Sequence, residues 1–189
     1  MEFSTDADVL LMRRLADGDD LALNEIMSRW RERVAAFLLR MVGDYATAMD
    51  LTQECFVRLY TSRQSYKPTA AFSTYLFQIA CNLARSHARW RRRHPTVPLE
   101  DEDGIMVREP ADTQLPPDSA ADLREKIVMV NQAIAALPAE LREALLLFTV
   151  EDMSHAEIAT AMRCSQKAVE TRIYRARQTL KSTLRAMDS

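Results

Sequence analysis

The chain has 189 residues and a mass of 21.6 kDa, which suits one large domain or two small ones with a buried core. Apolar residues make up 48% and charged residues 28%, with a net charge of only −2, so neither disorder nor membrane insertion is favoured. Glycine occurs only three times, whereas a sheet protein with many tight turns needs more, and a helical fold is therefore the first expectation.

No part of the sequence predicts export or a membrane span. The N-terminus is acidic and has no apolar run behind it, which excludes a secretory signal, and no stretch approaches the ~18 consecutive apolar residues of a transmembrane helix. Cys55, Cys81 and Cys164 lie far apart with no CxxC motif, so they are expected to be buried and reduced. We therefore expect a cytoplasmic protein.

The charged residues are unevenly distributed along the chain. Residues 1–95 hold 14 basic and 11 acidic side chains, residues 96–122 hold one base and eight acids, and residues 123–189 hold ten bases and eight acids. Two mildly basic segments therefore flank an acidic connector, a pattern that the net charge of the whole chain conceals.

The first 94 residues show helical periodicity almost throughout. Apolar residues recur at spacings of three and four, and Gly43 follows the longest run as an expected C-terminal cap. The sequence Tyr66-Lys67-Pro68 interrupts the pattern once more. This segment therefore predicts four helices and no strand, over about 9–15, 23–42, 45–61 and 71–92.

The remaining residues predict a connector and a second helical segment. From His94 to Ala121 helical periodicity is absent, and five prolines beside a group of acids predict an extended, solvated linker. Helical spacing resumes at Leu123, stops at Pro138, and returns in three further segments at 141–148, 154–162 and 165–186. The expected fold class is all-α, with two small helical domains (1–94 and 122–189) joined by an acidic, proline-containing linker (95–121).

The last two expected helices have the pattern of a helix-turn-helix. Ser154 and Glu157 have capping-box spacing, and Ser165 is an N-cap candidate directly after a tight turn. From Arg163 to Arg185 there are seven bases and one acid, opposite an apolar stripe. The alternative is an ordinary amphipathic helix with a solvated basic face, but the capped helix and turn before it favour a helix that enters the major groove. Its candidate DNA-contacting residues are Gln166, Lys167, Glu170, Thr171, Arg172, Arg175 and Arg177.

Two features of the first segment go beyond a helical core. In the third expected helix, acidic side chains and one amide side chain lie on the same face. By itself this pattern indicates only a solvated face or a partner surface. In the fourth, aromatic residues precede a basic helix end, which provides the stacking and phosphate neutralisation that unpaired nucleic acid requires. Most of the aromatic stripe is expected to be core, and the better candidates for exposed contacts are Tyr75, Asn82 and Trp90.

These motifs, taken in order, resemble those of the extracytoplasmic-function (ECF) sigma factors. Residues 50–54 (Asp-Leu-Thr-Gln-Glu), 72–76 (Phe-Ser-Thr-Tyr-Leu) and 79–82 (Ile-Ala-Cys-Asn) resemble region two of that family. Leu137-Pro138, Glu157-Ile158-Ala159 and the segment from Val169 to Arg177 resemble region four. A glycine common in the turn before the recognition helix is Arg163 here, which costs roughly 1 kcal/mol if that residue is left-handed.

The resemblance implies a dissociable initiation subunit of bacterial RNA polymerase, with no enzymatic activity and no cofactor. Its expected partners are core RNA polymerase, promoter DNA and an anti-sigma factor. Region two would bind core polymerase and melt the minus-ten element, and region four would read the minus-thirty-five element. The implied core-binding residues are Asp50, Leu51, Gln53 and Glu54. The implied minus-ten residues are Tyr75, Asn82, Arg85, Arg89, Trp90 and Arg92. The implied minus-thirty-five residues are the seven candidates named above for the last helix.

Two other classes of protein compete with this interpretation. The C-terminal four helices also resemble the output domains of response regulators, but the first segment shows neither the strands nor the phosphorylatable aspartate of a receiver domain. A helical enzyme finds no support, because His87, His94 and His155 are scattered without metal-ligand spacing or a nucleophile motif.

Overall fold

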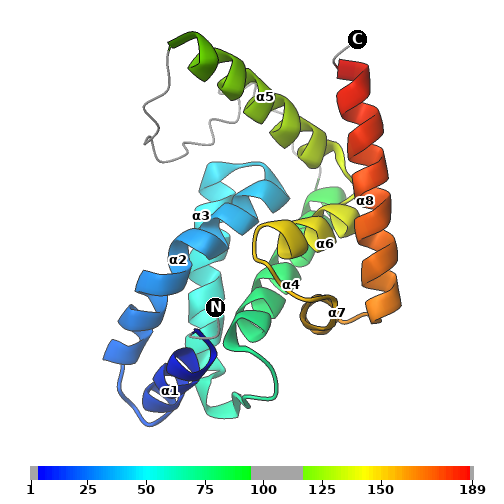
Figure 1. Cartoon of the computed structure of the whole chain (residues 1–189). Coiled ribbons are helices and arrows are strands. Elements are labelled where there is room, and N and C mark those ends of the chain that lie inside the picture. Colours follow the sequence, from blue (N-terminus) through cyan, green and yellow to red (C-terminus); the bar gives the residue numbers. More distant parts are fainter. Residues whose placement is uncertain (1–3, 95–116, 188–189) are drawn as a thin grey trace.

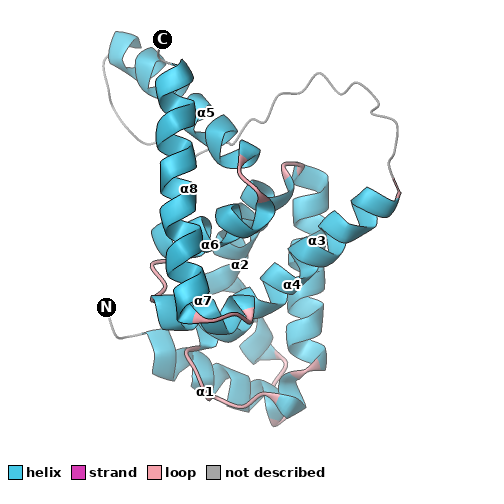
Figure 2. Cartoon of the chain, turned by 90° about the vertical axis from the view of Figure 1, so that its right-hand side faces the viewer, coloured by secondary structure: helices cyan, strands magenta, loops and turns pink. Residues whose placement is uncertain are grey.

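The computed structural model describes residues 4–94 and 117–187, and these are helical almost throughout, with no strand. The helices in residues 4–94, here called the first block, surround a common core, and those in residues 117–187, the second block, pack on one side of it (Figures 1 and 2). The first block comprises α1 (Ser4–Ala16), α2 (Leu21–Val42), α3 (Tyr45–Thr61), a 3-10 turn η1 (Arg63–Ser65) and α4 (Phe72–Arg93). The second comprises α5 (Pro117–Ala136), α6 (Ala139–Thr149), α7 (His155–Met162) and α8 (Gln166–Met187).

The expected all-α fold class is confirmed, and most helix ends lie within two residues of the sequence prediction. The α2 helix ends at Gly43, whose φ of 80° lies in the left-handed region that glycine adopts without steric penalty. Asp44 then begins α3, because its carboxylate accepts a hydrogen bond from the Thr47 backbone N–H at 2.7 Å.

The start of α5 is a correction to the sequence prediction. Residues 117–121 were expected to belong to the extended linker, but α5 begins at Pro117. Proline at the first helical position removes no hydrogen bond, and its fixed φ suits a helix, so Pro117 begins the helix instead of preventing it. The rest of the predicted linker, residues 95–116, lies outside the described residues.

The core of the first block is built around aromatic side chains. The Trp30 ring of α2 packs edge-on against Phe72 and Phe77 of α4, at centroid distances of 5.7 and 6.4 Å, and Phe37 meets Phe77 at 5.3 Å. The Trp30 indole N–H donates to the buried carboxylate of Asp8 in α1 at 3.2 Å. These contacts fix α4, which carries the candidate minus-ten residues, against α1 and α2.

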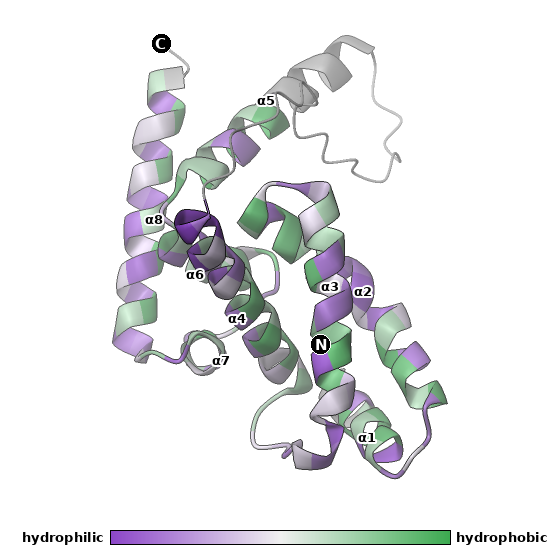
Figure 3. Ribbon diagram, turned by 180° about the vertical axis from the view of Figure 1, so that it is seen from behind, coloured by the Kyte–Doolittle hydropathy of each residue, from purple (hydrophilic) through white to green (hydrophobic). Residues whose placement is uncertain are grey.

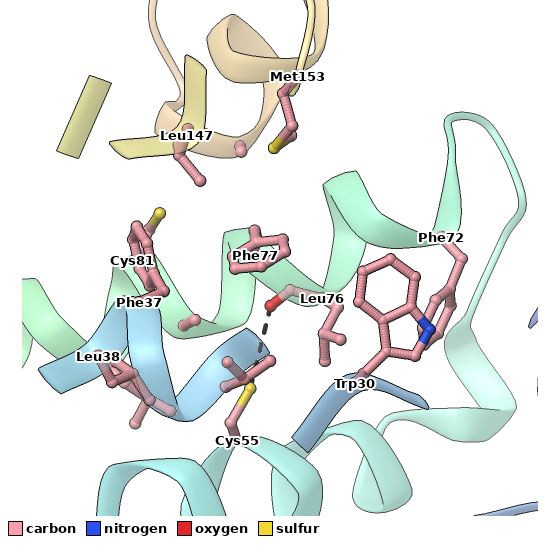
Figure 4. Packing of buried hydrophobic residues seen from close by; sticks show 14 of the residues in the cluster. Trp30, Phe37, Leu38, Cys55, Phe72, Leu76, Phe77, Cys81, Leu147 and Met153 are labelled. Atoms are coloured by element: carbon pink, nitrogen blue, oxygen red, sulfur yellow. Dashed lines mark hydrogen bonds between the residues drawn. The ribbon is translucent and has the colours of Figure 1, made fainter. Parts of the chain in front are cut away.

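The same core continues into the second block. Figure 4 shows Leu147 of α6 and Met153 of the following loop lying over Cys81 and Phe77 of α4, and all four side chains are buried. The α7 helix packs against α4, and α8 packs against α5, α6 and α7. One continuous hydrophobic cluster therefore joins helices that belong to different predicted domains.

No helix in the two described ranges is both long enough and apolar enough to cross a membrane.

Candidate nucleic-acid interface

Helix α7 begins with the predicted capping box. The Glu157 backbone N–H donates to Ser154 Oγ at 3.3 Å, and the Ser154 N–H donates to Glu157 Oε2 at 2.9 Å. Two backbone donors that the helix cannot satisfy internally are thereby satisfied. This capping fixes where the first helix of the helix-turn-helix starts.

The turn between α7 and α8 is set by two residues. Arg163 has a φ of 54°, so the left-handed conformation considered from the sequence is present. Ser165 Oγ then accepts a hydrogen bond from the Ala168 backbone N–H at 3.2 Å, which confirms its capping role. The two helices are thus separated by a short turn of the helix-turn-helix kind, in which the Arg163 and Cys164 backbone N–H groups donate to carbonyls of α7.

The recognition helix α8 buries one face and exposes the other. Val169, Ile173 and Ala176 are buried against the second block. Hydrophilic side chains recur along the helix (Figure 3), and the exposed ones among the candidates are Gln166, Lys167, Glu170, Arg175 and Arg177. Lys167 and Glu170 form a surface ion pair at 3.1 Å that water or DNA can easily displace.

Three further candidates on α8 also have partners within the protein. Arg172 is only 23% exposed and donates to Glu140 Oε2 at 2.7 Å and to Cys164 Sγ at 3.2 Å, so it ties the turn and α6 to α8. The guanidinium of Arg177 lies over the Phe148 ring at 5.1 Å. Thr171 is half-buried, and its hydroxyl donates to the Lys167 carbonyl at 2.9 Å.

Sequence reasoning missed one exposed aromatic residue on this face. Tyr174 is 64% exposed. It lies four residues after Glu170 and three before Arg177, so helical spacing alone places it beside the candidate readers. That spacing could have identified it, and a tyrosine there offers a hydroxyl and a ring face to DNA.

The basic end of α4 is open to solvent. Arg89, Arg92 and Arg93 are exposed and, with Ser86, line an open cleft of about 600 Å³. Trp90 is 49% exposed and stacks between two histidines, on His94 at 5.1 Å and on His87 at 6.2 Å. Burial lowers the pKa of His87, the nearby Arg91 adds to that effect, and Asp44 opposes it. About half of the Trp90 side chain therefore stays in contact with solvent beside the two histidine rings.

Asn82 lies in a second cleft, one helical turn or more away from that basic end. This cleft has a volume of about 500 Å³, and its walls come from α3 and α4 together with Arg163 of the second block. Tyr75 also lines it, but its side chain is half-buried, with its hydroxyl 2.6 Å from Ser62 Oγ and its ring 5.0 Å from that of Tyr66. Asn82 is half-buried as well, so of the three side chains expected to be exposed only Trp90 is. Tyr75 is covered by Ser62 and Tyr66, which lie on either side of η1.

Arg85 is the candidate minus-ten residue most closely held by the rest of the protein. Its guanidinium forms an ion pair with Glu143 of α6 at 2.8 Å. Burial raises the pKa of Glu143, and the neighbouring Cys81 and Arg85 oppose that rise. Arg85 therefore lies one turn after Asn82 on α4, but its guanidinium is bound to Glu143 of the second block.

The candidate polymerase-binding residues lie together on α3. Asp50 and Gln53 are exposed, and Glu54 is half-buried and pairs with Arg58 at 2.7 Å. Leu51 packs against the core with part of its side chain accessible. The helix therefore presents a compact polar face beside one apolar side chain.

The three cysteines are free thiols that differ in burial. Cys55 and Cys81 are buried as expected, and burial raises the pKa of Cys55 to about 12. Cys164 is only half-buried, which corrects the expectation for that residue, because it lies in the turn and not in a helix. Among the described residues, no three His, Cys, Asp or Glu side chains are grouped so that they could hold a metal ion.

Models of known protein families match both blocks of the chain. The family model for Sigma-70 region 2 matches residues 26–94, and that for Sigma-70, region 4 matches residues 127–180. The RNA polymerase sigma-H factor of Pseudomonas aeruginosa is 32% identical over 95% of this chain and 95% of its own length. The ECF RNA polymerase sigma-E factor of Escherichia coli (strain K12) is 31% identical over 92% of each.

Solved structures show the same fold. A chain in the structure of CnrH in complex with the cytosolic domain of CnrY matches with a TM-score of 0.71 and 26% identity, over 96% of this chain and 99% of that one. A chain in the co-crystal structure of the sigma factor RpoE with the anti-sigma factor NepR from Bartonella quintana matches with a TM-score of 0.64 and 20% identity. The match covers 86% of this chain and 96% of that one.

The chain therefore belongs to the sigma-70 family of RNA polymerase sigma factors, with both of the family's DNA-associated regions present. Its similarity to sigma-E factors along nearly its whole length places it in the ECF branch. The alternative of a response-regulator output protein is not favoured, because the similarity includes the first block as well as the second.

Proposed function

We propose that this protein binds core RNA polymerase and directs promoter-specific initiation, and that it does so as a non-enzymatic subunit acting in the cytoplasm. The observation that supports this function best is the pairing, on one chain, of a helix-turn-helix with an aromatic, basic helix end. The first suits duplex DNA and the second suits unpaired strands. A conventional regulator needs only the first.

The proposed division of labour follows the blocks. Residues 1–94 bind core polymerase and melt the minus-ten element, residues 122–189 read the minus-thirty-five element, and the acidic segment between them, 95–121, connects the two. The helical start at Pro117 shortens the stretch available as a linker to at most residues 95–116. An acidic connector between two DNA-binding units can occupy a positively charged channel of the polymerase before RNA does.

In the minus-thirty-five interaction, the first two turns of α8 read base edges. Lys167 and Glu170 are exposed there, and Gln166 and Thr171 flank them. Arg175 is exposed one turn later and reaches bases or phosphates. Arg172 and Arg177 have a mainly positioning role in this proposal, because both contact side chains of the second block.

In the minus-ten interaction, the Asn82 cleft receives an extruded base. Extruding a base costs a few kcal/mol, which contacts in the cleft and stacking must offset. Trp90 stacks on the unpaired strand, and Arg89 and Arg92 neutralise its phosphates. Tyr75 supports the cleft wall, and Arg85 reaches the strand once it leaves Glu143.

The α3 face binds core polymerase through Asp50, Leu51, Gln53 and Glu54. Replacement of Gln53 and Glu54 by alanine should weaken binding to core while stability changes by less than about 1 kcal/mol, because Gln53 is exposed and the Glu54–Arg58 ion pair lies at the surface. An Asn24→Ala variant, altered at an exposed residue of α2, is the matched control. Unaltered affinity of the double variant for core polymerase would remove this assignment.

An anti-sigma factor is a further proposed partner. CnrH is seen in complex with the cytosolic domain of CnrY, and RpoE is seen in complex with the anti-sigma factor NepR. Because this chain shares its fold with both, we extend to it the proposal of inhibition by a dedicated protein.

In vitro transcription tests the proposed function. Purified core polymerase is incubated with a library of random promoter sequences, with and without this protein. We expect transcripts that share a minus-ten and a minus-thirty-five sequence only in its presence. Stoichiometric binding to core polymerase also separates a sigma factor from a simple regulator. Absence of both results would reject the function.

A further inference from the structure

Three aromatic rings lie in a row along the last two turns of α4. The Trp90 ring stacks on His94 at a centroid distance of 5.1 Å and on His87 at 6.2 Å, with interplanar angles of 23° and 25°. His87 precedes Trp90 by three residues and His94 follows it by four, so all three side chains share one face of the helix. The two imidazoles therefore lie on opposite sides of the indole, and each covers part of one of its faces.

The two histidines are held with different firmness. His87 is half-buried and lies near Asp44, the residue that caps the start of α3. His94 is exposed and is the residue at which α4 ends, with a non-helical φ of −126°. Its Nδ1–H donates to the Trp90 carbonyl at 3.1 Å, a local contact within one turn. Because helix ends fray easily, His94 can leave the indole at little cost, whereas His87 cannot.

A row of exposed arginines runs beside the stack. Arg89, Arg92 and Arg93 line the open cleft of about 600 Å³ with Ser86, and Figure 2 shows this end of α4 extending away from the other helices. Within the described residues, none of these three guanidiniums pairs with a carboxylate. Ser86, Arg89 and Arg93 repeat at the spacing of the three rings, one residue earlier, so the two rows run parallel about 100° apart around the helix. A nucleotide that stacks on Trp90 therefore has cations beside it for its phosphates.

The kind of base that suits this position follows from what it must replace. The imidazole of His94 is a single five-membered ring, whereas the indole beside it has two fused rings. A purine also has two fused rings and covers more of the indole than the imidazole does, so the exchange gains stacking. A pyrimidine is a single ring and gains little over the imidazole. The exchange therefore favours adenine or guanine, although stacking alone accepts every base.

On the basis of the proposed function, we propose that the His94 side of the Trp90 ring is a subsite for one unpaired purine, and that the imidazole of His94 occupies it in the absence of DNA. On binding, His94 swings away at the helix end and the purine takes its place on the indole. Arg89 and Arg93 then hold the neighbouring phosphates. Phosphate contacts carry no sequence information, so this exchange gives the basic end of α4 a preference among bases.

Binding of single-stranded DNA to the full-length protein tests this proposal without polymerase, because Trp90 and His94 are exposed. Fluorescence anisotropy at low salt compares a labelled strand of ten thymidines with the same strand carrying one central deoxyadenosine. We expect the wild-type protein to prefer the deoxyadenosine strand about threefold. His94→Ala leaves the subsite open and should bind that strand about fivefold more tightly, the effect of one aromatic pair. His94→Phe, whose larger ring covers more of the indole, should bind it more weakly than the wild type.

Three controls separate the exchange from other effects. His87→Ala removes the ring on the other side of Trp90 and should leave affinity unchanged. Trp90→Ala should abolish the preference for deoxyadenosine, and in that background His94→Ala should have no further effect. The slope of log affinity against log salt should be the same for the wild type and His94→Ala, because stacking adds no phosphate contact.

Several outcomes would overturn the proposal. If His94→Ala binds the deoxyadenosine strand no more tightly than the wild type, the imidazole does not occupy a base subsite, and tighter binding of His94→Phe would make residue 94 a direct stacking contact. Tighter binding of His87→Ala alone would place the subsite on the opposite face. Equal affinity of the wild type for the two strands, or no binding of either, would remove the purine subsite. A protein inactive with core polymerase would reject the sigma function, whereas these titrations still decide the subsite.

Discussion

The arginine-rich parts of α4 and α8 look alike in the sequence but differ in the folded protein. Arg89, Arg92 and Arg93 at the end of α4 are exposed around an open cleft. On α8, Arg172 is bound to Glu140 and Cys164, and Arg177 lies over Phe148. The number of basic residues therefore overstates how many arginines of α8 are free to bind DNA. Substitution of arginines in α4 and in α8 should therefore affect DNA binding and stability differently.

The largest expected effect is at the start of α8. Lys167 is 85% exposed, so Lys167→Ala should leave stability unchanged but weaken binding to duplex minus-thirty-five DNA by about 1–3 kcal/mol and relax specificity at one base pair. Binding curves on matched and singly mutated sites measure this. A loss that is equal for all sequences would make Lys167 a phosphate contact instead.

A comparable effect is expected at the end of α4, but on unpaired DNA. Trp90→Ala should weaken binding of single-stranded minus-ten DNA by about 1–3 kcal/mol, the value typical of one lost stacking contact. Permanganate reactivity of the open complex should fall more than duplex binding. Trp90→Phe, which keeps a ring, should retain most of the activity, and an equal loss in both variants would contradict the stacking role.

A smaller effect should separate Arg172 from Arg175. Arg172→Ala removes hydrogen bonds to Glu140 and Cys164, so the free energy of unfolding should fall by about 1 kcal/mol, with Glu140 too exposed for a larger effect. Arg175→Ala, at an exposed position, should alter DNA binding alone. Urea unfolding of the two variants provides the measurement, and equal stabilities would remove the positioning role of Arg172.

The smallest effect concerns salt dependence. Replacing Arg89 and Arg92 together by alanine should reduce the slope of log affinity against log salt by about 1.4 for single-stranded DNA, at ~0.7 per phosphate contact. Arg177→Ala on α8 should change the duplex slope by less than one contact, since its guanidinium is held over a ring. Titrations at several salt concentrations test both, and an unchanged α4 slope would exclude phosphate contacts there.

The helices could be predicted from the sequence because their ends are marked by local chemistry. Gly43, Pro138 and the Ser154–Glu157 capping box each determine a boundary through backbone geometry or hydrogen bonding that needs no distant partner. Pro117 shows the limit of this reasoning, because the same residue type ends one helix and begins another depending on its position.

The interface between the blocks could not be predicted in the same way. In the sequence, Glu143 and Glu151 are two more acids on helical or loop segments. They become buried only because Arg85 and Arg33, 58 and 118 residues away, meet them across the fold. Likewise, nothing local indicates that Tyr75 is covered by the loop that follows η1.

The hydrophobic cluster that joins the two blocks has a thermodynamic consequence for the free protein. Leu147 and Met153 share their surroundings with Phe77 and Cys81, so neither block can unfold without exposing apolar surface of the other. Heating should therefore produce one calorimetric transition, with equal van't Hoff and calorimetric enthalpies, although the chain contains two functional units. Replacement of Arg33 by glutamate places two like charges where Arg33 now pairs with Glu151 across the blocks. In that variant the transition should divide into two, each with a smaller heat-capacity change.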